Sequence, residues 1–201
     1  MSRTAPAPRA ASHVALTQHS AWVARWLHLL APGSRVLDFA CGTGRHARLA
    51  LAAGHRVLAV DRDPSVLNAL QGTQAEIRQE DLEAERWSFA AERFDAVVCT
   101  NFLHRPRLDL LAALLADGGL LIYETFAAGN ERYGRPSNPA FLLRPGELAD
   151  LARRAGLHLL AYEDGVTERL PARVQRACAV RPPFDPAALA LDRSGRGGTL
   201  E

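Results

Sequence analysis

Short apolar runs alternate with amphipathic segments along most of the chain. Residues 35–40, 55–61 and 94–101 are nearly continuous apolar runs, as expected of strands that are buried on both faces of a parallel sheet. Residues 20–30 and 47–53 instead place apolar side chains at helical spacing. This alternation of strand and helix patterns predicts an α/β domain.

The same pattern continues to about residue 180 and supplies further elements. A helix is predicted to begin at Pro106, to bury Leu108, Leu111, Ala112 and Leu115, and to break at Gly118-Gly119. Pro145 is predicted to open another helix that ends at Gly156. The other strands are predicted at residues 75–79, 120–125, 157–162 and 173–180.

One glycine-rich turn joins the first strand to its helix. Gly42 and Gly44 leave this turn free of side chains, so a ligand can touch the backbone beside a helix N-terminus. Asp38 stands at the end of the strand, where it would repel a pyrophosphate but suit an ammonium or sulfonium group. Asp61 ends the second strand 17 residues after Gly44, where an acid accepts hydrogen bonds from a ribose diol. S-adenosylmethionine carries both of these groups.

The Asp-x-x-x-Gly-x-Gly element of residues 38–44, with Asp61 downstream, closely resembles the signature of class I S-adenosylmethionine-dependent methyltransferases. The resemblance implies a three-layer α/β sandwich with a mostly parallel, seven-stranded, Rossmann-like sheet and an antiparallel strand pair at its C-terminal end. It places the methionine end at Asp38 and the glycines, the ribose at Asp61 and the adenine at Asp81. The cofactor-binding residues that it implies are Asp38, Ala40, Gly42, Gly44, Asp61, Arg62, Asp81, Leu82 and Asn101.

Catalytic candidates follow the fourth and fifth strands, where acceptor and methyl group meet in this family. They are His104, Tyr123 and Glu124, although His104 is equally consistent with a solvated loop residue and Glu124 with a loop anchor. A general base is needed only if the acceptor is protonated at the working pH. Arg45 and His46 open the helix after the glycines and are candidates for binding an anionic acceptor.

Residues 126–144 show neither helical nor strand periodicity. Irregular segments of this length commonly serve as lids or binding loops. We therefore predict an acceptor-site lid here, with Tyr133 and Arg135 as its leading acceptor contacts.

Several acceptor classes fit the family resemblance. The order of elements is similar to that of the tellurite-resistance-type methyltransferases, which favours a small-molecule acceptor. An RNA or protein acceptor would require a basic docking face. Residues 101–104 lack the Asn/Asp-Pro-Pro-aromatic tetrad of enzymes that methylate amino groups of nucleic acids, which argues against such an acceptor. A binding protein without turnover stays open, and Asp38 disfavours an NAD-dependent oxidoreductase.

Composition adds limits on partners and compartment. The 201 residues fit one domain, and the net charge of +2 comes from an arginine excess without any lysine, so it indicates no nucleic-acid surface. Three cysteines and seven histidines show no metal-ligand spacing, which favours a reducing cytoplasm and no metal site. No apolar run reaches the ~20 residues of a membrane helix. We predict a disordered arm at 1–12, a methyltransferase domain at 13–181 and a flexible tail at 182–201; the sequence carries no signal for an oligomeric state.

Overall fold

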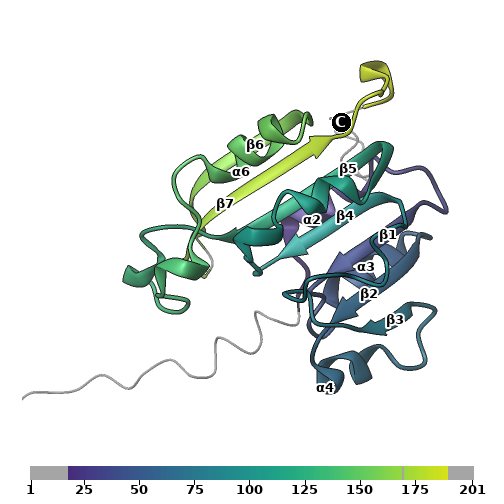
Figure 1. Ribbon diagram of the computed structural model, residues 1–201, viewed down its shortest axis with the longest axis horizontal. Coiled ribbons are helices and arrows are strands. Elements are labelled where there is room, and N and C mark those ends of the chain that lie inside the picture. Colours follow the sequence, from purple (N-terminus) through teal and green to yellow (C-terminus); the bar gives the residue numbers. More distant parts are fainter. Residues whose placement is uncertain (1–17, 169, 190–201) are drawn as a thin grey trace, which may run out of the picture.

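The computed structural model describes residues 18–168 and 170–189. The predicted arm, residues 1–12, lies outside this part, as does the predicted tail beyond residue 189. A seven-stranded sheet with the order β3-β2-β1-β4-β5-β7-β6 forms the centre of the molecule (Figure 1). It confirms the predicted mostly parallel sheet.

Parallel pairing joins the first five strands, and the C-terminal strands complete the sheet. Strand β7 pairs antiparallel with both β5 and β6, which confirms the predicted antiparallel pair. The bounds are β1 Arg35–Phe39, β2 Arg56–Asp61, β3 Glu76–Gln79, β4 Phe94–Thr100, β5 Leu115–Phe126, β6 His158–Val166 and β7 Arg173–Val180.

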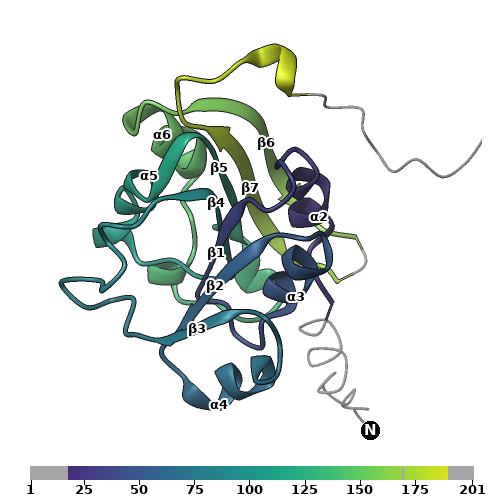
Figure 2. The same cartoon turned by 90° about the vertical axis from the view of Figure 1, so that its right-hand side faces the viewer.

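Helices cover both faces of this sheet (Figure 2). Helices α2 (Ala21–Leu27) and α3 (Arg45–Ala52) lie on one face, and α5 (Leu110–Ala113) and α6 (Glu147–Arg154) lie on the other. Helix α4 (Pro64–Leu67) lies near the β3 edge. Ser20 and Asp63 cap α2 and α4 with their side-chain oxygens, because these short polar side chains accept a bond from a free first-turn N–H.

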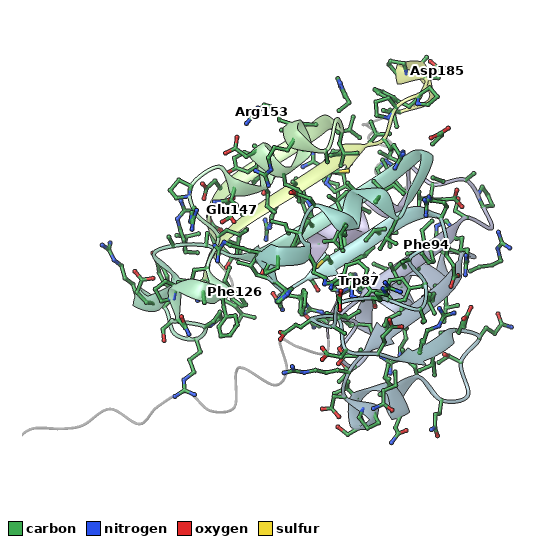
Figure 3. The ribbon with its side chains drawn as sticks, in the orientation of Figure 1. Trp87, Phe94, Phe126, Glu147, Arg153 and Asp185 are labelled. Carbon is green, nitrogen blue, oxygen red and sulfur yellow. The ribbon has the colours of Figure 1, made fainter. Side chains whose placement is uncertain are left out.

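Two apolar clusters fill the spaces between the sheet and its helices, as an α/β sandwich requires. One contains Phe39, Trp87 and Phe94, of which Trp87 and Phe94 are labelled in Figure 3. The other packs Trp22 and Trp26 of α2 against the opposite face. The three cysteines are buried free thiols, as their positions in apolar strands predict.

The prediction of a helix from Pro106 to Gly118 is wrong. A 3₁₀ turn (Arg105–Arg107) and the short α5 occupy its start, and Leu115 already belongs to β5. Leu115 pairs with Phe94 across a register shift, so strand pairing wins over a helical pattern that was weak on its own. Two other helices are shorter than predicted: α2 ends at Leu27 and α6 starts after Pro145.

The predicted lid is an irregular segment with fixed internal contacts. It holds 3₁₀ turns at Asn130–Arg132 and Pro139–Phe141. The buried Asn130 side chain donates to the Pro136 carbonyl (2.9 Å) and accepts from the Arg173 amide (3.0 Å). A backbone bridge between Ala127 and Leu143 closes its base. These contacts fix the loop against the start of β7.

Candidate active site

A pocket of about 350 Å³ lies at the carboxyl ends of the parallel strands. This edge of an open α/β sheet is where ligands bind, because the strand order reverses there. The lining residues come from the segments after β1 to β5 and from the lid. They are Ala40, Asp61, Arg62, Asp81, Leu82, Glu83, Asn101, Phe102, Leu103, Thr125, Phe126, Pro136 and Phe141.

Asp61 is held in this pocket by two backbone donors. Its Oδ2 accepts from the Gly42 amide at 2.9 Å, and its Oδ1 accepts from the Asp63 amide at 3.0 Å. A carboxylate has about four lone-pair positions, so these two bonds leave acceptor capacity for a ligand. The contact with Gly42 also ties the end of β2 to the glycine turn after β1.

The turn after β1 depends on backbone conformations that suit glycine. Gly42 and Gly44 have φ values of +53° and +74°. A Cβ at Gly44 would lie 2.4 Å from the Leu70 side chain, so the turn packs directly on the segment after α4. Ala40 and Asn101 also take positive φ values, 56° and 55°, although both carry side chains. Such strain at two neighbouring strand ends is typical of a functional site.

Asp38 lies beneath the turn and does not line the pocket. It is 1% exposed, and its Oδ2 accepts from the Ala47 amide at 2.8 Å. Burial raises the pKa of Asp38 to about 7, against the lowering effects of that hydrogen bond and of Arg45. The structure therefore shows Asp38 fixing the start of α3 from beneath the turn.

Acidic side chains dominate one end of the pocket. Asp61, Asp81 and Glu83 line it, and Arg62 is the sole basic residue among the described lining residues. Asp81 Oδ1 accepts from the Glu83 amide at 3.0 Å, while Leu82 is buried. The excess of carboxylates favours a cationic ligand. The residues that line the pocket therefore fit a nucleoside sulfonium.

The polar residues on the α2/α3 face form what we term the closed cluster: Ser20, His46, Thr100, Glu124 and Arg176. Glu124 Oε2 accepts from Ser20 Oγ (3.1 Å) and from Arg176 Nε (2.5 Å). His46 Nε2 accepts from the Ser20 amide (3.1 Å), so its Nδ1 carries the proton and faces Thr100 Oγ1 at 3.4 Å. Burial is the main cause that lowers the pKa of His46 to about 3.

Arg45 borders the closed cluster. Its guanidinium donates to the Gln18 carbonyl (3.1 Å) and to Thr100 Oγ1 (3.5 Å). Burial is the main cause that lowers the pKa of Arg45, and Glu124 opposes the shift. The sequence predicted a role in acceptor binding or catalysis for Arg45, His46 and Glu124. In the structure all three lie outside the pocket lining and bind other parts of the protein.

Two other catalytic candidates also lie outside the pocket lining. Tyr123 is fully buried, and its hydroxyl donates to the Phe102 carbonyl at 2.7 Å. Burial raises its pKa well above the usual value, which speaks against Tyr123 as a base and gives it a role in holding the segment after β4. His104 starts the 3₁₀ turn after β4 and is half-buried.

The lid contributes residues to the pocket, but not those that the sequence favoured. Tyr133 and Arg135 are exposed and absent from the lining, whereas Phe126, Pro136 and Phe141 form part of it. Phe102, Leu103 and Thr125 were missed as well. Their positions next to Asn101 and Glu124 at strand ends were the available signal. Phe102 and Leu103 are apolar, however, so their sequence pattern is that of core residues.

Within residues 18–168 and 170–189, no three His, Cys, Asp or Glu side chains are grouped so as to hold a metal ion. Among the helices of the same residues, none combines the length and the apolar composition that crossing a bilayer needs.

Comparisons with known proteins agree with this geometry. A sequence model described as a methyltransferase domain matches residues 36–119. A Xylella fastidiosa (strain M23) protein named ubiquinone biosynthesis O-methyltransferase is 34% identical over 188 residues, covering 75% of each chain. The structure of TehB from Haemophilus influenzae superposes with a TM-score of 0.65 at 19% identity, over 79% of this chain and 61% of that one. Burkholderia thailandensis 1,6-didemethyltoxoflavin-N1-methyltransferase, solved with 1,6-didemethyltoxoflavin and S-adenosylhomocysteine, gives 0.61 at 21% identity over 89% and 93%.

Proposed function

This chain belongs to the class I S-adenosylmethionine-dependent methyltransferases, and we propose that it transfers the methyl group to a small-molecule acceptor. The observation that carries this proposal is the pocket itself, which runs from the acids after β2 and β3 to a wall of lid residues. A pocket of about 350 Å³ that must also admit part of the cofactor suits a small acceptor better than a folded polymer. Relatives named O-methyltransferases of ubiquinone biosynthesis support the same acceptor class, with oxygen as the methylated atom.

The cofactor assignment rests on residues that have unused acceptors facing the pocket. Asp61 keeps lone pairs free beside the two amides that orient it, which suits the ribose hydroxyls. Asp81, with the Leu82 backbone, suits the adenine amine, and Ala40, Arg62 and Asn101 complete the wall. Asp38, Gly42 and Gly44 contribute by shaping the turn that carries the methionine end.

When bound, S-adenosylmethionine supplies an electrophilic methyl group for in-line displacement by the acceptor. The chain's part is to hold acceptor and cofactor in line and to exclude water, and good alignment alone lowers such barriers by about 7–11 kcal/mol. Among the described lining residues there is no histidine or tyrosine to remove a proton. This supports an acceptor that reacts as an anion or as a neutral nucleophile without a dedicated base.

Two measurements test this function. Calorimetry with S-adenosylhomocysteine should show binding at one site per chain. Labelled S-adenosylmethionine, incubated with the protein and separate small-molecule, RNA and protein fractions of a bacterial extract, should label the small-molecule fraction. Label in RNA or protein would establish the rival acceptor class, and binding without label in any fraction would indicate a binding protein without turnover.

A further inference from the structure

The pocket has two halves of different chemistry. Asp61, Asp81 and Glu83, after β2 and β3, form its acidic half. The other half, which we call the apolar half, lies after β4 and β5 and under the lid. It consists of Phe102, Leu103, Phe126, Pro136 and Phe141. Under the proposed function the acidic half holds the adenosine of the cofactor, which leaves the apolar half for the acceptor.

Phe141 is exceptional within the apolar half because the residue is 50% exposed. The next two residues, Leu142 and Leu143, are buried at 4% and 0%. Single exposed apolar side chains are ordinary on protein surfaces, but this one lines a pocket beside other rings. Covering it with a ligand would remove apolar surface from water, which favours binding.

Arg105 fixes the backbone on both sides of Phe141. Its guanidinium donates to the Ala140 carbonyl (2.8 Å) and to the Leu142 carbonyl (2.6 Å). The same group forms a two-pronged ion pair with Glu147 of α6, at 2.7 and 2.9 Å. Figure 3 labels Glu147 and Phe126 at the lid end of the molecule. Arg105 therefore ties the lid to α6 from the segment after β4.

This arrangement holds the lid in place before any acceptor arrives. Glu147 Oε2 also accepts from the Arg144 amide (2.7 Å), which fastens the lid's far end. Asn138 accepts from the Ala140 amide (3.0 Å) and starts the 3₁₀ turn that carries Phe141. Because these groups are ordered in advance, an acceptor would bind without the cost of ordering a loop.

We propose that the apolar half binds the flat, uncharged ring of an aromatic acceptor, and that Arg105 is a positioning residue that holds Phe141 against this ring. The proposal deepens the small-molecule function above and rests on it. Three phenylalanine rings and one proline favour an aromatic partner, because rings gain from stacked and edge-to-face contacts beyond buried area. Arg62, the one basic lining residue found among those described, follows β2, so the apolar half offers no charge for an acidic ring substituent.

The test compares aromatic and saturated compounds of equal size. The protein, saturated with S-adenosylhomocysteine, is titrated with 2-naphthol and catechol and with their counterparts decahydro-2-naphthol and cyclohexane-1,2-diol. At least one aromatic compound should bind about tenfold or more tightly than its saturated counterpart. Equal affinities, or no binding of either aromatic compound at millimolar concentration, would overturn the proposal. Failure of S-adenosylhomocysteine itself to bind would instead refute the proposed function.

Two matched variants test whether the aromatic compounds bind against Phe141. F141A should weaken aromatic binding about tenfold, while Y133A, which removes the exposed lid aromatic outside the pocket, should change it less than about twofold. S-adenosylhomocysteine affinity should stay unchanged in both. An F141A protein with wild-type affinity for the aromatic compounds, or equal losses in F141A and Y133A, would overturn the assignment.

Arg105 needs a test that separates positioning from simple stabilisation. R105A should weaken aromatic binding about fivefold and speed amide hydrogen exchange at residues 140–143, with cofactor affinity unchanged. R105K keeps the charge but lacks the branched guanidinium that donates to two carbonyls at once. It should therefore restore little of the aromatic binding or of the protection from exchange. The control R154A removes a surface pair with Asp109 (3.0 Å) and should leave both readings unchanged. Full rescue by R105K, or wild-type exchange and binding in R105A, would contradict the role.

Discussion

The pocket and the closed cluster lie at the carboxyl ends of the same strands, but they differ in what their polar side chains bind. In the closed cluster, Glu124 and His46 bind other protein groups. In the pocket, Asp61 is oriented by two amides and still faces open space. The difference teaches that an acid or histidine at a strand end becomes a ligand-binding group only when its acceptors are left unfilled by the protein.

The largest effect is expected from removing Asp61, the acid whose oxygens still face the pocket. Asp61→Ala should weaken S-adenosylhomocysteine binding about 100-fold, because hydrogen bonds to a charged group contribute about 1.5–3 kcal/mol each. Calorimetry measures the change, and circular dichroism checks the fold.

Asp63→Ala is the matched control for that variant. Asp63 is an exposed helix cap two positions further on, so its loss should lower stability slightly and leave cofactor affinity intact. A similar loss of affinity in both variants would mean that Asp61 has no special place in the site.

Replacing Glu124, the acid of the closed cluster, should lower the stability of the protein and leave cofactor affinity almost unchanged. Glu124→Gln removes the closer of the two carboxylates that pair with Arg176 and leaves only Glu163 (3.1 Å), so urea unfolding should show a loss of about 1–3 kcal/mol. S-adenosylhomocysteine affinity should stay within about threefold of wild type. Normal stability combined with abolished methyl transfer would instead make Glu124 a catalytic residue.

A smaller effect concerns pH and the buried groups on the closed side. The pKa of His46 is lowered to about 3, so stability from this group rises as pH increases toward its ordinary value of 6.5. The pKa of Asp38 is raised from 3.8 to about 7, so stability from Asp38 falls as pH increases over the same interval. Between about pH 4 and 6.5 the two contributions oppose each other.

Asp38→Asn keeps the acceptor for the Ala47 amide but removes the acid's titration. Relative to wild type, the free energy of unfolding of this variant should therefore rise with pH by about 1 kcal/mol per pH unit over that interval. Urea unfolding at pH 4.5, 5.5 and 6.5 measures the slope. Parallel curves for the two proteins would show that Asp38 ionises normally in the folded state.

Local signals made much of the fold and the acidic half of the pocket predictable. The apolar strands, the Gly42/Gly44 turn and the caps at Ser20 and Asp63 depend on neighbours a few residues away, so they follow from short-range patterns. Asp61 was predictable because the end of a parallel strand fixes which edge of the sheet its side chain reaches.

Long-range contacts decided the rest. Glu124 is bound by Ser20, 104 positions away, and by Arg176, 52 positions away, and no local pattern announces such pairs. In the lid, the choice of Phe141 over Tyr133 as a pocket residue depends on Arg105, which follows a different strand. The apolar stretch up to Leu115 fitted both helix and strand, and pairing with Phe94 settled it.

The position of β7 has a consequence for how this protein is made. The last of the described strands does not add to an edge but inserts between β5 and β6, where Cys178 and Val180 are fully buried. A ribosome releases residues 173–180 only after the other six strands of the described sheet have emerged. Until then β5 has an unpaired edge, so the sheet cannot be completed before residues 173–180 have left the ribosome.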